Sequence, residues 1–326
     1  MEKLTKIMWN QKPKFTERSR TVLGKRQSWL FMSMALLFGH ASLVSSQTLS
    51  SGASGNWTAI ATWLTSGTGT ITTVSNNATV NGSGSNFSAS MIGMGLYNAS
   101  NVRIGTRTVS SVASATSLTL SGTAGANNNN IAYKYGAVPG NFTVNINHDV
   151  VVNQSLAINS PGSYTVNGTL IDAAGGTAYS LTLDGQNATN RGTFTVNGNT
   201  TFGGALTVNN NGHLIINSGD TLRVGGTTFT NNCYVTIHEG GVLIVNGNLT
   251  NEVNSTNIEV NGSIIVLGNV INKNQGDVYG AGSVTATGTI SNGTGSKVFG
   301  SSDNCSSGPC SSSGGTTCSY TSSVSG

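Results

Sequence analysis

Side chains able to carry out acid–base chemistry are sparse along this chain. The acids that follow residue 46 are Asp149, Asp172, Asp184, Asp220, Glu239, Glu252, Glu259, Asp277 and Asp303. Breaking a polysaccharide needs grouped carboxylates, or a basic side chain beside a calcium site, and the sequence has no Asp-Asp or Asp-x-Asp cluster. His148-Asp149 and His238-Glu239 are adjacent pairs, but neighbours on a strand face opposite sides. We therefore predict no catalytic residue and no cofactor.

Four cysteines in the second half of the chain are candidate disulfide partners. They are Cys233, Cys305, Cys310 and Cys318. Four cysteines allow three pairings, among which the sequence does not choose. A metal site would need Cys-x2-Cys spacing or nearby histidines. Neither pattern occurs, so we predict no metal.

Two aromatic side chains have the type and spacing of a sugar-stacking pair. Trp57 and Trp63 flank a short turn and are the only tryptophans after residue 46. Such a pair either stacks on a glycan or closes the open end of an apolar core. The large area that aromatic rings bury favours the core cap, with glycan stacking as the alternative.

The charge distribution argues against a nucleic-acid partner. Charged residues make up 8% of the chain, against roughly 25% in ordinary soluble domains. Residues 1–46 hold eight basic and two acidic residues (8 − 2 = +6), and the remainder holds seven and nine (7 − 9 = −2). The basic excess therefore belongs to the leader. A phosphate-binding surface needs clustered cations, and Arg103 with Arg107 is the closest pair.

Residues 1–46 have the three parts of a secretory signal. Lys25-Arg26 precede an apolar block at 29–38, and small residues follow as far as Ser46. This order is typical of a signal peptide, with cleavage expected after Ser46. The alternative is an uncleaved membrane anchor, for which the apolar run is short. We expect a secreted, extracellular or cell-surface protein that meets the membrane only through its export signal.

Short alternating runs recur along residues 139–300 and predict a stacked repeat. The strand cores are 142–144, 164–166, 181–183, 194–196, 206–208, 214–216, 222–224, 235–237, 243–245, 258–260 and 264–266. Leu206, Leu214 and Leu222 lie eight residues apart, and Asn-Gly pairs such as Asn197-Gly198 close several runs. Asn and Gly tolerate the positive φ that a turn can require. Three units of eight residues would form one coil.

The predicted fold is therefore all-β, a right-handed parallel β-helix of about seven coils. Stacked coils would align apolar side chains inside and asparagine ladders at the corners. Asn-Gly turns also form hairpins, so an antiparallel β-sandwich is the alternative.

The repeat is flanked by other segments. Residues 47–64 are expected to form an N-terminal cap segment. Residues 65–138 contain short alternating runs separated by Gly, Asn and Ser, which predict a small inserted β-module with a loop at Asn127–Asn130. Residues 301–326, mostly Ser, Gly, Thr and Cys, are expected to form a tail.

Two motifs resemble the secreted, adhesin-like β-helix proteins of Bacteroidetes-type bacteria. The first is Ser54-Gly55-Asn56-Trp57 followed by Ala61-Thr62-Trp63, and the second is the alternating run 144–152 around His148. In that family a GNW…ATW opening leads to a V-x-I-x-H-x-V-x-V strand and then to L-x-V-N-x-G coils. The resemblance covers the opening and residues 139–300, and the inserted segment resembles a β-module of phage tail fibres.

The resemblance implies a surface or secreted structural protein that uses the Sec route and often the type IX system. It also implies a structural role for His148, and O-glycosylation at Thr221, because Asp220-Thr221-Leu222 matches the family's consensus. Members commonly end in a β-sandwich sorting domain, for which residues 301–326 are too short, so we expect a truncated chain or another export route.

We expect a non-catalytic structural or adhesive module that binds glycans or surface components. The alternative is a carbohydrate-active β-helix enzyme, a polysaccharide lyase or pectinase-like hydrolase. Ice binding by rows of threonine is a minor alternative. Outward threonines recur at 165, 182, 195, 207 and 236, but Ile215, Arg223 and Ile244 break the row.

Overall fold

The structure is a computed structural model that describes residues 47–140, 142–172, 177–252, 257–273 and 275–299, and the backbone of Cys305–Ser311. The described residues are mostly β-strand, with two short 3-10 helices, η1 (Ile60–Trp63) and η2 (Ala89–Met91), and contain no α-helix. None of the helices in these ranges has the length and apolar character to cross a bilayer. The predicted signal peptide, residues 1–46, lies outside the described residues.

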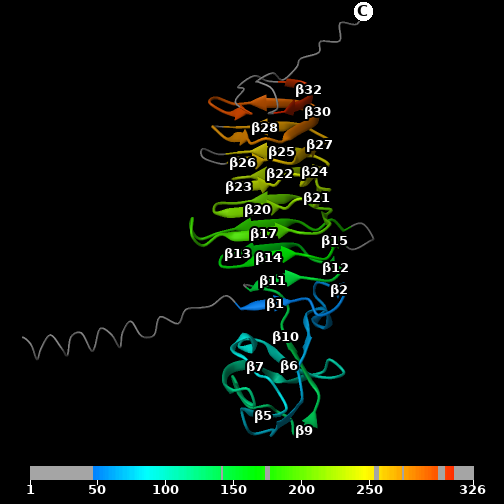
Figure 1. Cartoon of the computed structure of the whole chain (residues 1–326), viewed down its shortest axis with the longest axis vertical. Helices are drawn as coiled ribbons and strands as arrows, with labels where there is room; N and C mark the ends of the chain where they lie inside the picture. Colours follow the sequence, from blue (N-terminus) through cyan, green and yellow to red (C-terminus); the bar gives the residue numbers. More distant parts are fainter. Residues whose placement is uncertain are drawn as a thin grey trace, which may run out of the picture. The chain divides into compact units, whose positions relative to one another are not determined.

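Most strands belong to a solenoid with three faces (Figure 1). Face one contains β1 (Thr48–Ser50), β11 (Thr143–Ile146), β14 (Ser163–Val166), β17 (Gly192–Val196), β20 (Gly212–Ile216), β23 (Tyr234–Ile237), β26 (Asn257–Val260), β29 (Asp277–Tyr279) and β31 (Lys297–Val298). Face two contains β2 (Gly55–Asn56), β12 (Val150–Val152), β15 (Leu170–Asp172), β18 (Thr200–Phe202), β21 (Thr221–Val224), β24 (Val242–Val245) and β27 (Ser263–Val266).

Face three contains β13 (Leu156–Asn159), β16 (Leu181–Asp184), β19 (Leu206–Val208), β22 (Thr228–Asn231), β25 (Asn248–Asn251) and β28 (Val270–Asn272). The long strand β30 (Ser283–Asn292) joins faces two and three, because it pairs first with β27 and then with β28. Every pairing along the coils is parallel. The predicted parallel β-helix of about seven coils is thus confirmed, and the antiparallel β-sandwich is wrong for this segment.

Most coils are shorter than three units of eight residues, although the coil between Asn167 and Asn197 has 30 residues. Equivalent positions such as Asn147 and Asn167 are 20 residues apart. Along the first coil, inward residues follow steps of 150 − 144 = 6, 156 − 150 = 6 and 164 − 156 = 8. Only one corner of this coil takes an eight-residue step, and the other two turn more tightly. The series Leu206, Leu214 and Leu222 runs across three faces, so its regular spacing does not describe the whole coil.

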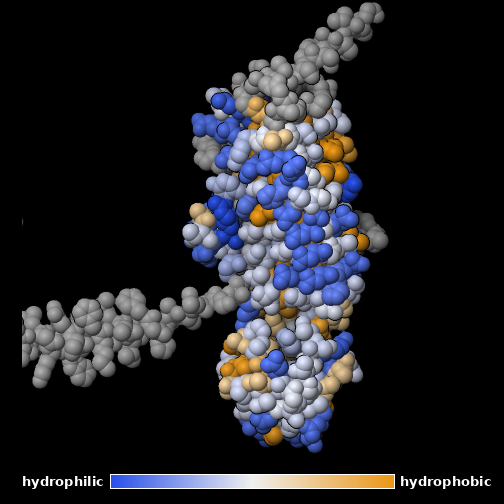
Figure 2. All heavy atoms as spheres, in the orientation of Figure 1, coloured by the Kyte–Doolittle hydropathy of each residue, from blue (hydrophilic) through white to orange (hydrophobic). Residues whose placement is uncertain are grey.

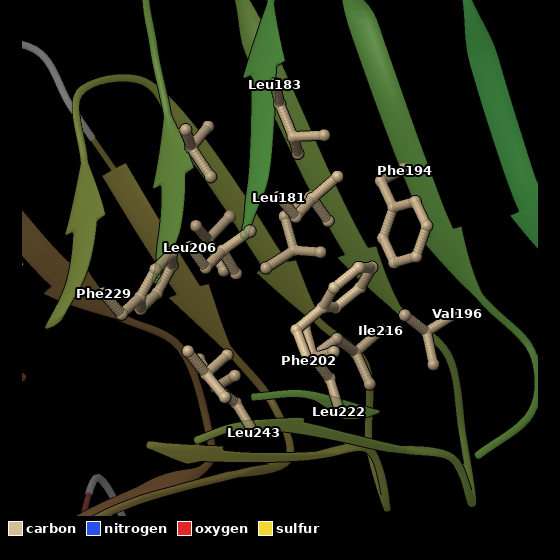
Figure 3. Packing of buried hydrophobic residues seen from close by; sticks show 14 of the residues in the cluster. Leu181, Leu183, Phe194, Val196, Phe202, Leu206, Ile216, Leu222, Phe229 and Leu243 are labelled. Carbon is tan, nitrogen blue, oxygen red and sulfur yellow. The ribbon is translucent and has the colours of Figure 1, made fainter. Parts of the chain in front are cut away.

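Alternate residues of every face point into one apolar core (Figure 3). Stacked coils place like positions in register, so Leu181 lies beside Leu206, and Phe194 beside Leu214. Phe194 and Phe202 come from two faces of one coil and meet edge to face, with ring centroids 5.9 Å apart. Hydrophilic residues cover much of the solenoid's visible outer surface (Figure 2). The strict inside–outside alternation explains why the strand cores could be recognised in the sequence.

The Asn-Gly pairs serve a different purpose from the one predicted. None of the four pairs that close predicted strands has a positive φ, namely Asn167-Gly168, Asn197-Gly198, Asn246-Gly247 and Asn261-Gly262. The glycines are required because neighbouring coils approach closely at the corners. A Cβ on Gly198 would overlap the carbonyl oxygen of Gly168 in the coil before it, and one on Gly262 would overlap that of Gly241. Here glycine supplies space and not turn geometry.

Two asparagine ladders run along the solenoid, as predicted for its corners. The exposed ladder follows face one, where Asn167 donates to Asn147 at 2.8 Å, Asn197 to Asn167 at 2.9 Å, and Asn217 to Asn197. The buried ladder ends face three. Asn231 donates to Asn251 at 2.8 Å, Asn251 to Asn272 at 2.8 Å, and Asn272 to Asn292 at 3.1 Å. In each ladder the side-chain amide bonds to an amide of the neighbouring coil instead of to water.

The segment before the first full coil folds as an antiparallel β-module with its own core. Its strands are β3 (Thr65–Ser66), β4 (Thr70–Thr73), β5 (Thr79–Ser83), β6 (Gly95–Asn98), β7 (Arg103–Ser114), β8 (Ser117–Leu120), β9 (Asn128–Ile131) and β10 (Tyr133–Gly136). Ile71, Leu96 and Leu118 are among its buried residues. Because β1 and β2 pair with β11 and β12, the module interrupts the solenoid after its first strands. The predicted loop at Asn127–Asn130 is wrong, since β9 begins at Asn128.

The predicted C-terminal tail contains a strand. Cys305–Ser311 forms β32, which pairs antiparallel with β30. Its Ser- and Gly-rich sequence lacks the apolar alternation by which strands are recognised. Backbone hydrogen bonds to an existing edge are available to any such sequence. The other residues of the predicted tail lie outside the described residues.

Replacing Gly198 by alanine is expected to lower the free energy of unfolding by about 1–3 kcal/mol, the usual cost of overpacking. Urea unfolding followed by circular dichroism measures this loss. Gly140→Ala is the matched control, because a Cβ there meets nothing within 4 Å, and its effect should stay within about 0.5 kcal/mol. Equal effects at both positions would contradict the close approach of the coils.

The two ladders allow a second comparison. Asn251→Ala leaves the buried Asn231 amide with only its 3.4 Å contact to the Cys233 carbonyl and removes the donor to the buried Asn272 side-chain oxygen, which should cost about 2 kcal/mol or more. Asn197→Ala removes the corresponding middle residue of the exposed ladder, where water takes over, and should cost less than about 1 kcal/mol. Melting temperatures of the two variants test this order, and the reverse order would refute the role assigned to the buried ladder.

Candidate ligand-binding face

The two tryptophans do not form a sugar-stacking platform. Trp57 is 1% exposed and Trp63 is 0% exposed. Their rings meet edge to face at 5.0 Å, and the Trp63 indole N–H donates to the Trp57 carbonyl at 2.7 Å. Both rings belong to the solenoid's core. The glycan-stacking alternative is therefore wrong, because no ring face is free, and the tryptophans belong to the core, as the favoured prediction stated.

Cys233 is a free thiol, 7% exposed, so its prediction as a disulfide partner is corrected. Burial raises the pKa of this thiol. In the backbone pairing, Cys305 of β32 lies opposite Ile290 and is four strand spacings from β22, the strand that precedes Cys233. That distance is about 19 Å, and a disulfide needs Cα atoms within about 7 Å. The side chains of Cys305, Cys310 and Cys318 lie outside the described residues.

Two other predicted residues lie in ordinary positions of the solenoid. Thr221 begins β21 on face two, half-buried and in register with Val242, and its O-glycosylation stays a prediction. His148 lies at a corner, where its Nδ1 is 3.0 Å from the Ser51 hydroxyl. Asp149 accepts a hydrogen bond from Thr169 at 2.6 Å. The two side chains of this sequence pair thus have separate partners.

The threonines that looked like one broken row are sorted by the coils onto separate faces. Thr165, Thr195 and Thr236 share a column of face one with Ile215. Thr182, Thr207, Thr230 and Thr250 form an uninterrupted column of face three. Arg223 and Ile244 lie on face two. One complete column is a single line of hydroxyls, and Thr250 is only 8% exposed, so it offers no lattice for ice.

Charged, histidine and tyrosine side chains gather on face one. They come from β20, β23, β26 and β29 and from the turn before β17. We call this group the face-one cluster, and it contains Arg191, His213, Tyr234, Glu259, Asp277 and Tyr279. These residues are far apart in sequence, but the parallel register aligns them in two columns. The first column holds His213, Tyr234, Asn257 and Asp277, and the second holds Thr236, Glu259 and Tyr279.

Arg191 and Tyr234 form the fixed part of this cluster. The Arg191 guanidinium lies over the Tyr234 ring, 4.1 Å from its centroid. The same side chain donates to the Ala188 carbonyl at 3.1 Å and approaches the Cys233 sulfur at 3.7 Å. A cation over an aromatic face is attracted by the ring quadrupole. Three contacts therefore hold the guanidinium in one place and leave other N–H donors for a ligand.

The surroundings of His213 favour its neutral form. Its ring packs edge to face on Tyr234 at 6.2 Å, and its Nε2 lies 3.0 Å from the Thr236 hydroxyl. Burial lowers the pKa of His213, as does the charge of Arg191 and, to a smaller extent, His238, while Glu259 raises it. Neutral imidazole offers one donor and one acceptor. Such a group suits a hydroxyl-bearing ligand better than a cation.

Tyr279 gives the cluster its open aromatic surface. Its side chain is 44% exposed, and it lies beside Glu259 in register. Burial of its hydroxyl and the charge of Glu259 raise the pKa of Tyr279, with Tyr234 adding to the effect. Asn261 donates to Glu259 at 3.1 Å and orients that carboxylate. From strand spacing and rise, the Tyr234 and Tyr279 Cα atoms lie about 12 Å apart.

The coils also bring two carboxylates together that the sequence separates. Asp277 pairs with Asn257, so Glu259 and Asp277 are diagonal neighbours on adjacent strands, about 7–8 Å apart between Cα atoms. The Asp277 Oδ1 atom is buried and has no hydrogen-bond partner. The expectation that the acids are scattered is thus wrong for this pair. Within the described ranges, no three His, Cys, Asp or Glu residues are grouped so as to hold a metal.

Sequence reasoning missed this cluster because its members follow no local motif. Positions 213, 234, 257 and 277 are joined only by the coil register, which requires the correct coil length. Steps of 21, 23 and 20 residues separate them (234 − 213, 257 − 234 and 277 − 257). The available signal was the replacement of Thr by His, Tyr, Glu and Asp at outward strand positions after residue 212.

Comparison with known proteins supplies no name for this arrangement. No protein-family model matches the chain, and no curated protein or solved structure matches it either. The face-one cluster is therefore the feature of the molecule that bears most directly on its function.

The electrostatics of His213 can be tested by NMR titration. Its midpoint should lie below the usual 6.5. Arg191→Gln should raise the midpoint and Glu259→Gln should lower it further. Because the pKa of His213 is lower in the folded than in the unfolded state, its neutral side chain contributes to stability above pH 6.5. This contribution is lost as the pH falls from 6.5 through the folded-state pKa. Shifts of the opposite sign in the two variants would show that these charges do not act on His213.

Proposed function

We propose that this chain is a secreted or cell-surface structural and adhesive β-solenoid that binds glycans, without turning them over, through the face-one cluster. The export signal expected at residues 1–46 and the resemblance to adhesin-like β-helix proteins support the compartment and the adhesive role. The observation that carries the binding site is the exposed Tyr279 ring beside Glu259, with Arg191, Tyr234 and His213 fixed on neighbouring strands.

The chemistry of this face suits a sugar. Aromatic rings offer flat apolar surfaces, while Glu259, Asn257 and the Thr236 hydroxyl lie on the same face. Carboxylate, amide and hydroxyl groups together accept and donate the hydrogen bonds that sugar hydroxyls make. Parallel strands hold these groups at fixed spacing, so little conformational freedom is lost on binding. A shallow open face of this kind fits an extended chain.

A carbohydrate-active enzyme is the second candidate, and one observation favours it. Glu259 and Asp277 share a face at a Cα separation of about 7–8 Å. In glycosidases, paired carboxyl groups lie roughly 5 to 9.5 Å apart. One oxygen of the Asp277 carboxylate, Oδ1, is buried. Both carboxylates would then flank a bound glycosidic bond.

A glycan-array screen of the purified protein tests the proposal. Tyr279→Ala should weaken binding of the selected glycan about 5- to 30-fold, the effect of removing an aromatic anchor worth about 1–2 kcal/mol. Thr207→Ala, an outward residue of face three, is the control and should change affinity less than about twofold. Equal loss in both variants would place the site elsewhere.

A degradation assay on the same glycans separates the two candidates. Binding without release of reducing ends or unsaturated products supports the adhesive reading. Turnover that disappears in Glu259→Gln and in Asp277→Asn, with binding retained, would replace it by the enzyme.

A further inference from the structure

The β-module differs from the solenoid in its net charge. Residues 65–138 contain Arg103, Arg107 and Lys134 and no acid, a net charge of 3 − 0 = +3. Residues 139–326 contain four basic and nine acidic residues, 4 − 9 = −5. The small excess of acid after residue 46 therefore conceals two segments of opposite sign.

The sheet register brings two of the cations, Lys134 and Arg103, into one row. Lys134 on β10 pairs with Tyr97 on β6, and Tyr97 pairs with Arg103 on β7. Directly paired residues share one face of a sheet. Lys134, Tyr97 and Arg103 thus form a row across three strands, about 10 Å from end to end between Cα atoms. We call this row, with Arg107, the basic row.

Local contacts fix these side chains without neutralising them. The Arg103 guanidinium donates to the Arg107 carbonyl at 3.4 Å, and the Lys134 ammonium donates to the Asn101 amide oxygen at 2.7 Å. Gly95 leaves room for this packing, because a Cβ there would lie 3.2 Å from both Arg103 Nε and the Tyr97 hydroxyl. Both partners of the cations are neutral groups. Among the described residues, the one ion pair joins Lys273 and Glu252 in the solenoid.

The three cations are also accessible. Arg103 and Arg107 are exposed, and Lys134 is half-buried. Arg103 and Lys134 each retain N–H donors beyond the one neutral contact described above. Unneutralised cations with free donors attract anions from solution, and the net negative solenoid directs a polyanion away from itself and toward the module.

We propose that the basic row binds an acidic polysaccharide, with carboxylate or sulfate groups seated on Arg103, Arg107 and Lys134. This site is separate from the face-one cluster and does not depend on it. Nucleic acid fits less well, because three cations are few for phosphate binding. The Tyr97 ring is also only 6% exposed and offers no surface for base stacking. Anionic membranes call for clusters of four to eight cations.

Affinity measurements on the full chain test this proposal. The probes are heparin and polygalacturonate as sulfated and carboxylated polymers, with neutral dextran, oligo-dT and phosphatidylserine-containing vesicles as comparisons. The two acidic polysaccharides should bind, and dextran should not. Affinity should fall steeply between about 0.05 and 0.5 M NaCl.

Variants locate the site. Arg103→Gln and Lys134→Gln should each weaken heparin binding about fivefold or more and lower the salt slope by about one. Arg223→Gln on face two removes the same charge from an exposed arginine and should change affinity less than about twofold. Unchanged melting temperatures confirm that the variants fold.

The proposal is overturned if Arg223→Gln weakens binding as much as Arg103→Gln, since only net charge would then matter. It is also overturned if oligo-dT or vesicles bind more tightly than both polysaccharides, or if no polyanion binds. Loss of heparin binding in Tyr279→Ala but not in Arg103→Gln would move the polyanion to face one. Failure of neutral glycans to bind the face-one cluster leaves this test unaffected.

Discussion

Close backbone contact between successive coils is the constraint on which the rest of this structure depends. At the corners, the coils approach so closely that glycine is the only residue that fits beside a carbonyl of the coil before. This contact keeps the strands of all three faces in parallel register. Register then decides which side chains meet. The apolar core, both asparagine ladders and the face-one cluster all follow from it.

The buried ladder shows how strict this register is. On face three the same inward position is Ile158, Leu183 and Val208 in the first coils and becomes Asn231, Asn251 and Asn272 in the later ones. A single buried asparagine among apolar neighbours would be costly. A column of them satisfies itself, because each amide donates to the next and accepts from the one before. Repeating asparagine in successive coils therefore removes the free-energy cost of burying its side chain in the core.

The strand register also explains which parts of the structure could be predicted from the sequence. Strands with plain alternation, such as 194–196 and 243–245, were predicted correctly, because each carries its own signal. Strands β22, β25 and β28 were missed, since an inward asparagine ends each of them and breaks the apolar rhythm. The coil length was wrong because one eight-residue series was extended to all corners. A wrong length misaligns every column, so the Tyr279–Glu259 pairing could not be derived from the sequence.

The final strand, β32, affects how one copy of this protein can associate with another. A parallel solenoid exposes at each end a row of backbone donors and acceptors that matches the start of another copy, much as a growing polymer end matches the next monomer. Strand β32 runs against the direction of β30 and occupies its edge. A second chain arriving in parallel finds those groups already bonded. Strand β32 therefore protects the last edge of faces two and three against the addition of a parallel strand.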